Sequence, residues 1–190
     1  MLTRRFEDAV SYAVHLHAGQ YRKGSRIPYV SHLFAVTSLV LEDGGDEDQA
    51  IGALLHDAAE DQGGEKTLKE IKDRFGIRVA EIVAECTDSL VTPKPSWKNR
   101  KEKYLENLKH APLDIMRISL ADKLHNARSI AMDLRKSGSQ IWSRFNGGKE
   151  GTLWYYQSLA QIFKERGFDY LSSELERVLT EMVALAEKES

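Results

Sequence analysis

A short segment of the sequence places one histidine and three acidic residues close together in an apolar stretch. His56 and Asp57 stand four residues ahead of Glu60 and Asp61, in the segment ALLHDAAED. Side chains three or four positions apart share one face of a helix, so a helix over residues 47–61 would put all four on one stripe. Burial of an unpaired charge is costly, and such a cluster normally needs a metal ion or another cationic partner. The fold must therefore accommodate a charged group within its apolar interior.

Two further residues are candidates for the same site. His32 begins a predicted helix with Ser31 as its N-cap, and Asp122 lies in a distant helical segment, LADKLHNAR. Two imidazoles and two carboxylates, with room for water, suit Mn²⁺, Fe²⁺ or Mg²⁺, whereas Zn²⁺ would favour fewer ligands. The alternative interpretation is an ion pair between His56 and Asp57 that stabilises a helical bundle. That alternative leaves the two following acidic residues crowded together without a reason.

Helical spacing of apolar residues dominates the chain, and no segment alternates convincingly between apolar and polar residues. The chain has 190 residues, of which 42% are hydrophobic, so it can form a substantial core. We expect an all-α bundle of about eight to ten helices, in a single domain over residues 1–190. Gly24, Pro28 and three basic residues fall between residues 20 and 29, which indicates a loop with room for a small β-hairpin.

The overall charge and the cysteine content argue against several classes of function. The formal net charge of −2 provides no general attraction to nucleic acid or to an anionic membrane. Cys86 is the only cysteine, which excludes an intramolecular disulfide and a cysteine-based zinc site. The N-terminal residues lack the apolar stretch of a secretory signal, and the apolar run Leu33 to Leu41 is too short to cross a membrane. We therefore expect a cytoplasmic protein that binds neither nucleic acid nor membrane.

Several segments, taken in order, carry a family resemblance. His32, His56–Asp57 and Asp122 follow one another as do the metal ligands of the HD-domain metal-dependent phosphohydrolases. Within that family the sequence most resembles the hydrolase domain of the RelA/SpoT alarmone enzymes, in the stand-alone Mesh1-like form known as small alarmone hydrolases. The segments that match are HAGQYRK at 17–23, PYVSH at 28–32, LLHDAAED at 54–61, FGIRVA at 75–80, Thr87–Asp88 and LADKLHNAR at 120–128.

The resemblance implies an activity and a set of site residues. The family removes the 3′-diphosphate from guanosine 3′-diphosphate 5′-diphosphate or 5′-triphosphate (ppGpp or pppGpp), giving GDP or GTP and pyrophosphate, typically with Mn²⁺. The implied metal ligands are His32, His56, Asp57 and Asp122. Glu60 and Asp61 match the pair that orients and deprotonates the attacking water, and crowding by Asp57 is expected to raise the pKa of such a base. The implied nucleotide contacts are Arg22, Lys23, Asn126, Ser129 and one of Tyr155 and Tyr156.

Some residues and functions keep more than one interpretation. Lys101 or Lys98, in a basic predicted helix from about Trp97, could contact phosphate, or that helix could simply present a solvated basic face. We interpret the remaining histidines as structural or solvated, namely His15, His17, His110 and His125. The same kind of metal site would suit another nucleotide, such as NADPH with its 2′-phosphate. A nucleotide-binding regulator with an inactive site is a further alternative, and the protein could be a monomer or a homodimer.

Overall fold

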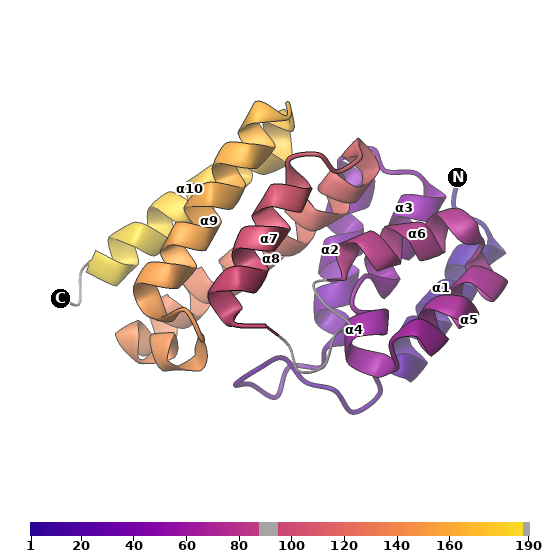
Figure 1. Cartoon of the computed structure of the whole chain (residues 1–190). Coiled ribbons are helices and arrows are strands. Elements are labelled where there is room, and N and C mark those ends of the chain that lie inside the picture. The colour runs from indigo at the N-terminus through magenta and orange to yellow at the C-terminus, as the bar shows by residue number, and fades with distance from the viewer. Residues whose placement is uncertain (88–94, 188–190) are drawn as a thin grey trace. The chain divides into compact units, whose positions relative to one another are not determined.

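The computed structural model describes residues 1–87 and 95–187, and these form ten α-helices, one 3₁₀-helix and no regular strand (Figure 1). The predicted all-α class is confirmed. Asp88, which contributes to the family resemblance, lies outside the described residues. Within the described part of the chain, no helix is both long enough and apolar enough to cross a membrane.

The helices group into two compact units. Among the described residues, the first unit contains 1–87 and 112–121, and the second contains 95–111 and 122–187. The long helix α8 (Leu113–Ser137) contributes its first residues to the first unit and the remainder to the second. The single domain over residues 1–190 stays a prediction.

The first unit is built around α3. It contains α1 (Arg4–Leu16), α2 (Val30–Glu42), α3 (Glu47–Leu55), α4 (Ala58–Gln62), α5 (Glu65–Phe75) and α6 (Ile77–Cys86). Helix α3 packs against α1, α2 and α6, and every residue from Gln49 to Leu55 is buried. A capping box starts this helix, because Asp46 Oδ1 accepts from the Gln49 amide at 3.0 Å and Gln49 Oε1 accepts from the Asp46 amide at 2.9 Å. The start and the burial of α3 position the residues that follow Leu55.

The second unit is a group of long helices joined by short connections. It contains α7 (Trp97–Leu108), most of α8, η1 (Gly138–Arg144), α9 (Gly148–Glu165) and α10 (Asp169–Glu187). Helix α9 packs against α7, α10 and η1, and α9 and α10 run side by side in Figure 1. The indole of Trp97 lies against Gly147 and Gly151, where an added Cβ would come within 2.6 and 3.1 Å of the ring. Small residues are therefore needed where α7 meets the start of α9.

Two local features differ from the sequence-based expectation. Ser31 is not the N-cap of α2, because the backbone of Tyr29 is already helical (φ −60°, ψ −33°) and the helix starts at Val30. The amides of Ser31 and His32 instead donate to the carbonyls of Pro28 and Tyr29. The loop over residues 20–29 folds back like a hairpin, but its only pairing of strand type among the described residues is one isolated antiparallel bridge, Tyr21 to Pro28.

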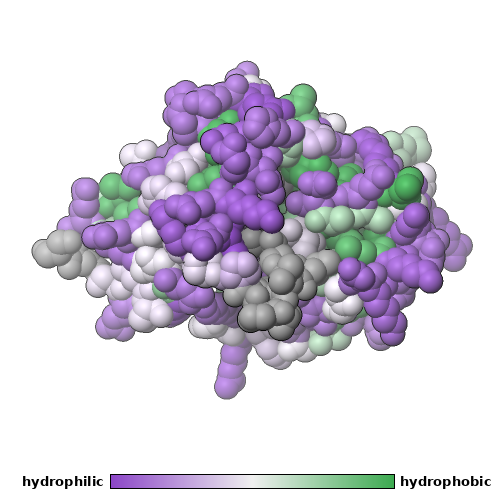
Figure 2. Space-filling view, in the orientation of Figure 1, coloured by the Kyte–Doolittle hydropathy of each residue, from purple (hydrophilic) through white to green (hydrophobic). Residues whose placement is uncertain are grey.

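Hydrophilic side chains cover most of the face shown in Figure 2, and apolar side chains form small separate areas. Exposed large apolar residues, such as Phe34, Ile77 and Tyr170, occur in several different helices. Single exposed apolar side chains are ordinary on a protein surface.

Candidate metal centre

The backbone departs from a regular helix at two of the predicted metal ligands. The sequence predicts one helix over residues 47–61, whereas the structure ends α3 at Leu55 and begins α4 at Ala58. Asp57 has φ −96° and ψ −3°, outside the ideal α-helical values, so His56–Asp57 forms a turn between the two helices. The prediction of one continuous helix is therefore wrong. The turn allows two adjacent side chains to reach the same site, which a regular helix would direct about 100° apart.

His32, His56 and Asp57 come together at this turn. One potential ligand atom from each residue lies within 4.8 Å of the others. The Nε2 atoms of His56 and His32 lie 3.0 Å and 3.7 Å from Asp57 Oδ2. Both histidines are buried and the aspartate is partly buried. Helix α2 supplies His32, and the turn between α3 and α4 supplies the other two side chains.

Hydrogen bonding determines which nitrogen of His56 carries a proton. Nδ1 lies 2.8 Å from the carbonyl oxygen of Ala53, and because a carbonyl only accepts, Nδ1 must be the donor. In a neutral His56, the Nε2 lone pair then faces the Asp57 carboxylate, and two acceptors stand 3.0 Å apart. This arrangement is favourable when a cation lies between them, either a proton or a metal ion. A backbone carbonyl that holds the other ring nitrogen is also the usual support of a metal-binding histidine. The donor set therefore fits a divalent metal.

Asp61 and Glu60 follow on the short helix α4. Although the Asp61 side chain reaches solvent, the surrounding protein desolvates its carboxyl and raises its pKa above the ordinary value. A hydrogen bond from Gln20 opposes this rise, and the charges of Asp57 and Glu60 add to it. The direction is the one expected from the sequence, but burial contributes more than crowding. A carboxylate with a raised pKa is a better base for water near neutral pH.

Two residues not predicted from the sequence, Tyr29 and Gln20, contact these acidic groups, and His17 contacts both of them. Tyr29 donates its hydroxyl hydrogen to Asp57 Oδ2 at 2.5 Å, and Gln20 donates through Nε2 to Asp61 Oδ2 at 2.8 Å. His17, which we interpreted as structural or solvated, is buried, lies 2.7 Å from Gln20 and stacks on the Tyr29 ring. The only available signal was that all three fall in segments that carry the family resemblance.

Arg22 and Lys23, which are predicted to contact the guanine of the nucleotide, lie in the same loop. The guanidinium carbon of Arg22 is 5.9 Å from the centre of the Tyr29 ring, and this side chain is partly buried. Lys23 is exposed. The positions of Arg22 and Tyr29 show that the loop already holds a guanidinium beside an aromatic ring. Contact of either basic residue with a nucleotide stays a prediction.

The remaining predicted ligand, Asp122, belongs to the second unit. Its buried carboxylate accepts from Lys123 Nζ through Oδ2 and from Asn126 Nδ2 through Oδ1, both at 2.5 Å. Burial alone would lower the pKa of Lys123, but the adjacent carboxylate of Asp122 raises it well above its ordinary value. Asp122 and Asn126 thus lie on the same face of α8. The role of Asp122 as a metal ligand stays a prediction.

Other predicted nucleotide contacts also lie in the second unit. Tyr155 and Tyr156 are both buried, with ring centres 5.8 Å apart. Burial raises the pKa of Tyr155 well above its ordinary value, and Lys101 Nζ lies 5.1 Å from the centre of its ring. The Ser129 hydroxyl donates to the carbonyl of His125 at 3.0 Å. Tyr155 thus lies close to a basic residue.

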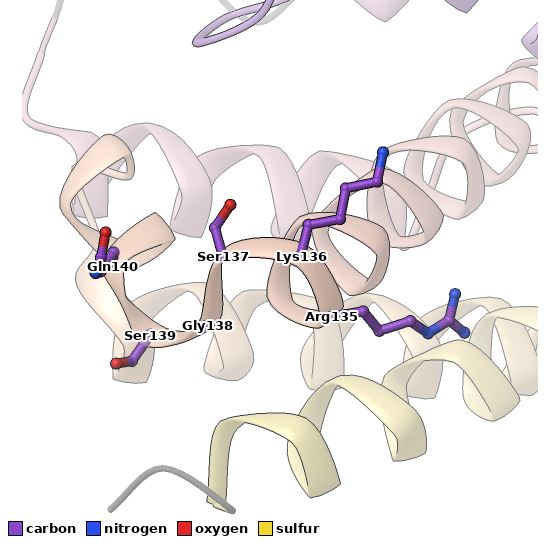
Figure 3. Close-up of a pocket in the computed structure, with 6 residues that line it drawn as sticks. All are labelled: Arg135, Lys136, Ser137, Gly138, Ser139 and Gln140. Carbon is purple, nitrogen blue, oxygen red and sulfur yellow. The ribbon is translucent and has the colours of Figure 1, made fainter.

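A pocket of about 560 Å³ in the second unit contains none of the predicted site residues (Figure 3). It is lined by Arg135 to Gln140, where α8 ends and η1 begins. Arg135 already donates to Glu181 at 2.6 Å. The pocket therefore adds nothing to the metal centre.

Comparison with known proteins identifies the family. The HD-domain family model matches residues 9–153, which include the whole His32, His56 and Asp57 cluster. This chain belongs to the HD-domain family. Guanosine-3′,5′-bis(diphosphate) 3′-pyrophosphohydrolase MESH1 of Mus musculus is 31% identical over 178 residues, or 92% of this chain and 90% of that protein. The protein of the same name from Xenopus tropicalis is 33% identical over 160 residues, or 83% of this chain and 82% of that protein.

A solved structure supports the same relationship. It is described as a metazoan ortholog of SpoT that hydrolyses ppGpp, and it matches with a TM-score of 0.76 and 25% identity. The match covers 95% of this chain and 97% of the other. The HD-domain protein is thus an HD-family phosphohydrolase related to the ppGpp 3′-pyrophosphohydrolases, and the resemblance drawn from its sequence is confirmed.

Proposed function

We propose that this HD-domain protein hydrolyses ppGpp or pppGpp at the 3′ position and releases GDP or GTP and pyrophosphate. The observation that carries the proposal is the His32, His56 and Asp57 cluster beside Asp61, in a chain homologous to MESH1 over most of its length. The cluster supplies ligands for a metal and the aspartate supplies a base. Both are needed to hydrolyse a phosphate ester by activated water.

His32, His56 and Asp57 would hold a divalent metal, with Asp122 as the proposed fourth ligand. Imidazole and carboxylate together suit Mn²⁺, which is our first choice, ahead of Mg²⁺, Fe²⁺ and Zn²⁺. When bound, such an ion makes its water more acidic and polarises a phosphoryl oxygen.

The acidic pair on α4 would carry the proton transfer. Asp61 accepts a proton from the attacking water, and Glu60 orients that water. The water oxygen bonds to the phosphorus attached to the 3′ oxygen, and the bond between that phosphorus and the 3′ oxygen breaks. The 3′ oxygen takes up a proton and becomes the hydroxyl of GDP or GTP. Because its pKa is raised, Asp61 can act first as the base that accepts a proton from water and then as the acid that donates a proton to the 3′ oxygen.

Basic and aromatic residues would bind the nucleotide. Arg22 and Lys23 would pack against the guanine, since a planar guanidinium stacks well on a planar ring. Lys101, which lies near the Tyr155 ring, would contact phosphate. Asn126, Ser129 and Tyr155 or Tyr156 would contribute the remaining contacts.

The direct test incubates the Mn²⁺-loaded protein with ppGpp and separates the nucleotides by chromatography. GDP and pyrophosphate in equal amounts support the proposal, and His56→Ala or Asp57→Asn should abolish their formation. Gln161→Met, which alters an exposed residue of α9, serves as the control. Release of phosphate from NADPH but no product from ppGpp would indicate the alternative substrate. Binding of ppGpp without turnover would indicate a regulator.

A further inference from the structure

One loop holds two acidic side chains of the metal centre at the same time. Tyr29 donates to Asp57 and Gln20 donates to Asp61, and in each case the carboxylate accepts. The Tyr29 amide donates to the Gln20 carbonyl oxygen at 2.9 Å, which closes the loop between the two donors. The support of the proposed ligand and the support of the proposed base are therefore parts of one closed structure.

His17 connects the two donors. Its ring stacks on that of Tyr29, with centres 5.2 Å apart and 21° between the planes, and its Nδ1 lies 2.7 Å from Gln20 Oε1. Because the Asp61 carboxylate only accepts, Gln20 must turn its NH₂ group toward Asp61 and its oxygen toward His17. His17 Nδ1 then carries the proton. Gln62 Nε2 donates to the same Gln20 oxygen at 2.7 Å, which agrees with this orientation.

We propose that Tyr29 and Gln20 are positioning residues, which hold Asp57 toward the metal and Asp61 toward the attacking water, and that His17 fixes the orientation of both. The inference rests on the proposed function of the site. A carboxylate rotates about its terminal carbon–carbon bond, and a hydrogen bond to one oxygen restrains that rotation. Loss of a partner that orients a metal ligand typically weakens metal affinity or activity by about 10- to 100-fold.

Tyr29→Phe tests the support of the metal ligand. It keeps the ring that stacks on His17 and removes only the hydroxyl that reaches Asp57. We expect the Mn²⁺ affinity, measured by titration without substrate, to fall about 10-fold or more. Tyr21→Phe removes a hydroxyl from an exposed tyrosine of the same loop and should leave the affinity unchanged. Equal Mn²⁺ affinity in Tyr29→Phe and the wild type would overturn this part of the inference.

Gln20→Met tests the support of the base. The side chain keeps its length but cannot donate to Asp61, so we expect kcat for ppGpp to fall about 10-fold while KM and Mn²⁺ affinity change less than about twofold. Gln161→Met removes a similar bond from glutamine to carboxylate on the surface of α9, at 2.6 Å, and should change none of these values. His17→Asn keeps a donor for Gln20 and should retain more activity than His17→Phe, which keeps only the ring. Unchanged kcat in Gln20→Met would refute its role.

Measurements without substrate separate this inference from the proposed function. In the metal-free wild type, ¹⁵N NMR of the His17 imidazole should show its proton on Nδ1, and Gln20→Met should remove that preference. If the wild type hydrolyses no ppGpp, the proposed function fails, while the His17 tautomer and the Mn²⁺ affinity of Tyr29→Phe still decide the inference. If the wild type hydrolyses ppGpp and these variants behave like it, the inference fails alone. Circular dichroism confirms that each variant is folded.

Discussion

Replacement of Gly52 by alanine tests whether the packing of α3 positions the ligands of the metal centre. An added Cβ would lie 2.5 Å from Ile82 Cγ2 and 3.3 Å from Ile82 Cβ in α6, and 3.4 Å from Ile118 Cδ1 in α8. A methyl on a branched carbon cannot move aside without moving the carbon that carries it. Overpacking of this kind costs about 1–3 kcal/mol, whereas alanine in place of glycine within a helix gains about 1 kcal/mol. Because the closest approach is only 2.5 Å, we expect a cost in the upper part of this range, about 2–3 kcal/mol, and so a net loss of about 1–2 kcal/mol in the free energy of unfolding.

Urea unfolding at equilibrium measures this loss of stability. A Mn²⁺ titration shows whether the substitution also displaces the metal ligands. Because α3 ends at Leu55, just before His56, a shift of α3 away from α6 should also weaken Mn²⁺ binding. Ile82→Leu removes the branching methyl, so adding it to Gly52→Ala should recover part of the stability lost. If Gly52→Ala unfolds at the same urea concentration as the wild type, this account of the packing is refuted. It is also refuted if the double variant is no more stable than Gly52→Ala alone.

Three further predictions concern the metal, the base and the core. At a concentration 100 times its Kd, Mn²⁺ should stabilise the folded state by about 2.7 kcal/mol and raise Tm by about 5–10 °C, and calorimetry should show most of this shift lost in Asp57→Asn. Asp61→Asn and Glu60→Gln should keep the fold and lower turnover at least ~10²-fold, and near-wild-type rates in both would contradict their roles. Burial, with a contribution from the charge of Glu70, raises the pKa of Tyr12 from 10.0 to about 12. The folded state therefore holds this proton more tightly, and urea titrations should show stability that is present below pH 10 and lost toward pH 12, with a smaller loss in Tyr12→Phe than in the wild type.

The sequence indicated which residues of the first unit share a site, but not the backbone that brings them together. The pattern of His56, Asp57, Glu60 and Asp61 predicted a cluster from helical spacing alone. The structure instead interrupts the helix at His56–Asp57, where a turn separates α3 from α4. Helical spacing describes a regular backbone, and a break confined to two residues leaves the apolar pattern on either side unchanged. The pattern therefore predicted correctly that His56 and Asp57 lie together, and predicted wrongly that one regular helix carries them.

The two aspartates predicted as metal ligands show which contacts can be read from a sequence. Asp122 accepts from Asn126, four positions along the same helix, and this spacing predicts their proximity. The adjacent Lys123 also donates to Asp122, although side chains one position apart do not share a helix face. Asp57 is contacted by Tyr29, which stands 28 positions earlier and reaches it only because the loop over residues 20–29 closes on itself. No periodicity relates two such positions, since their distance depends on the path of a loop. The contacts of Tyr29 with Asp57 and of Gln20 with Asp61 consequently had to come from the structure, and replacing these two residues should separate metal binding from turnover.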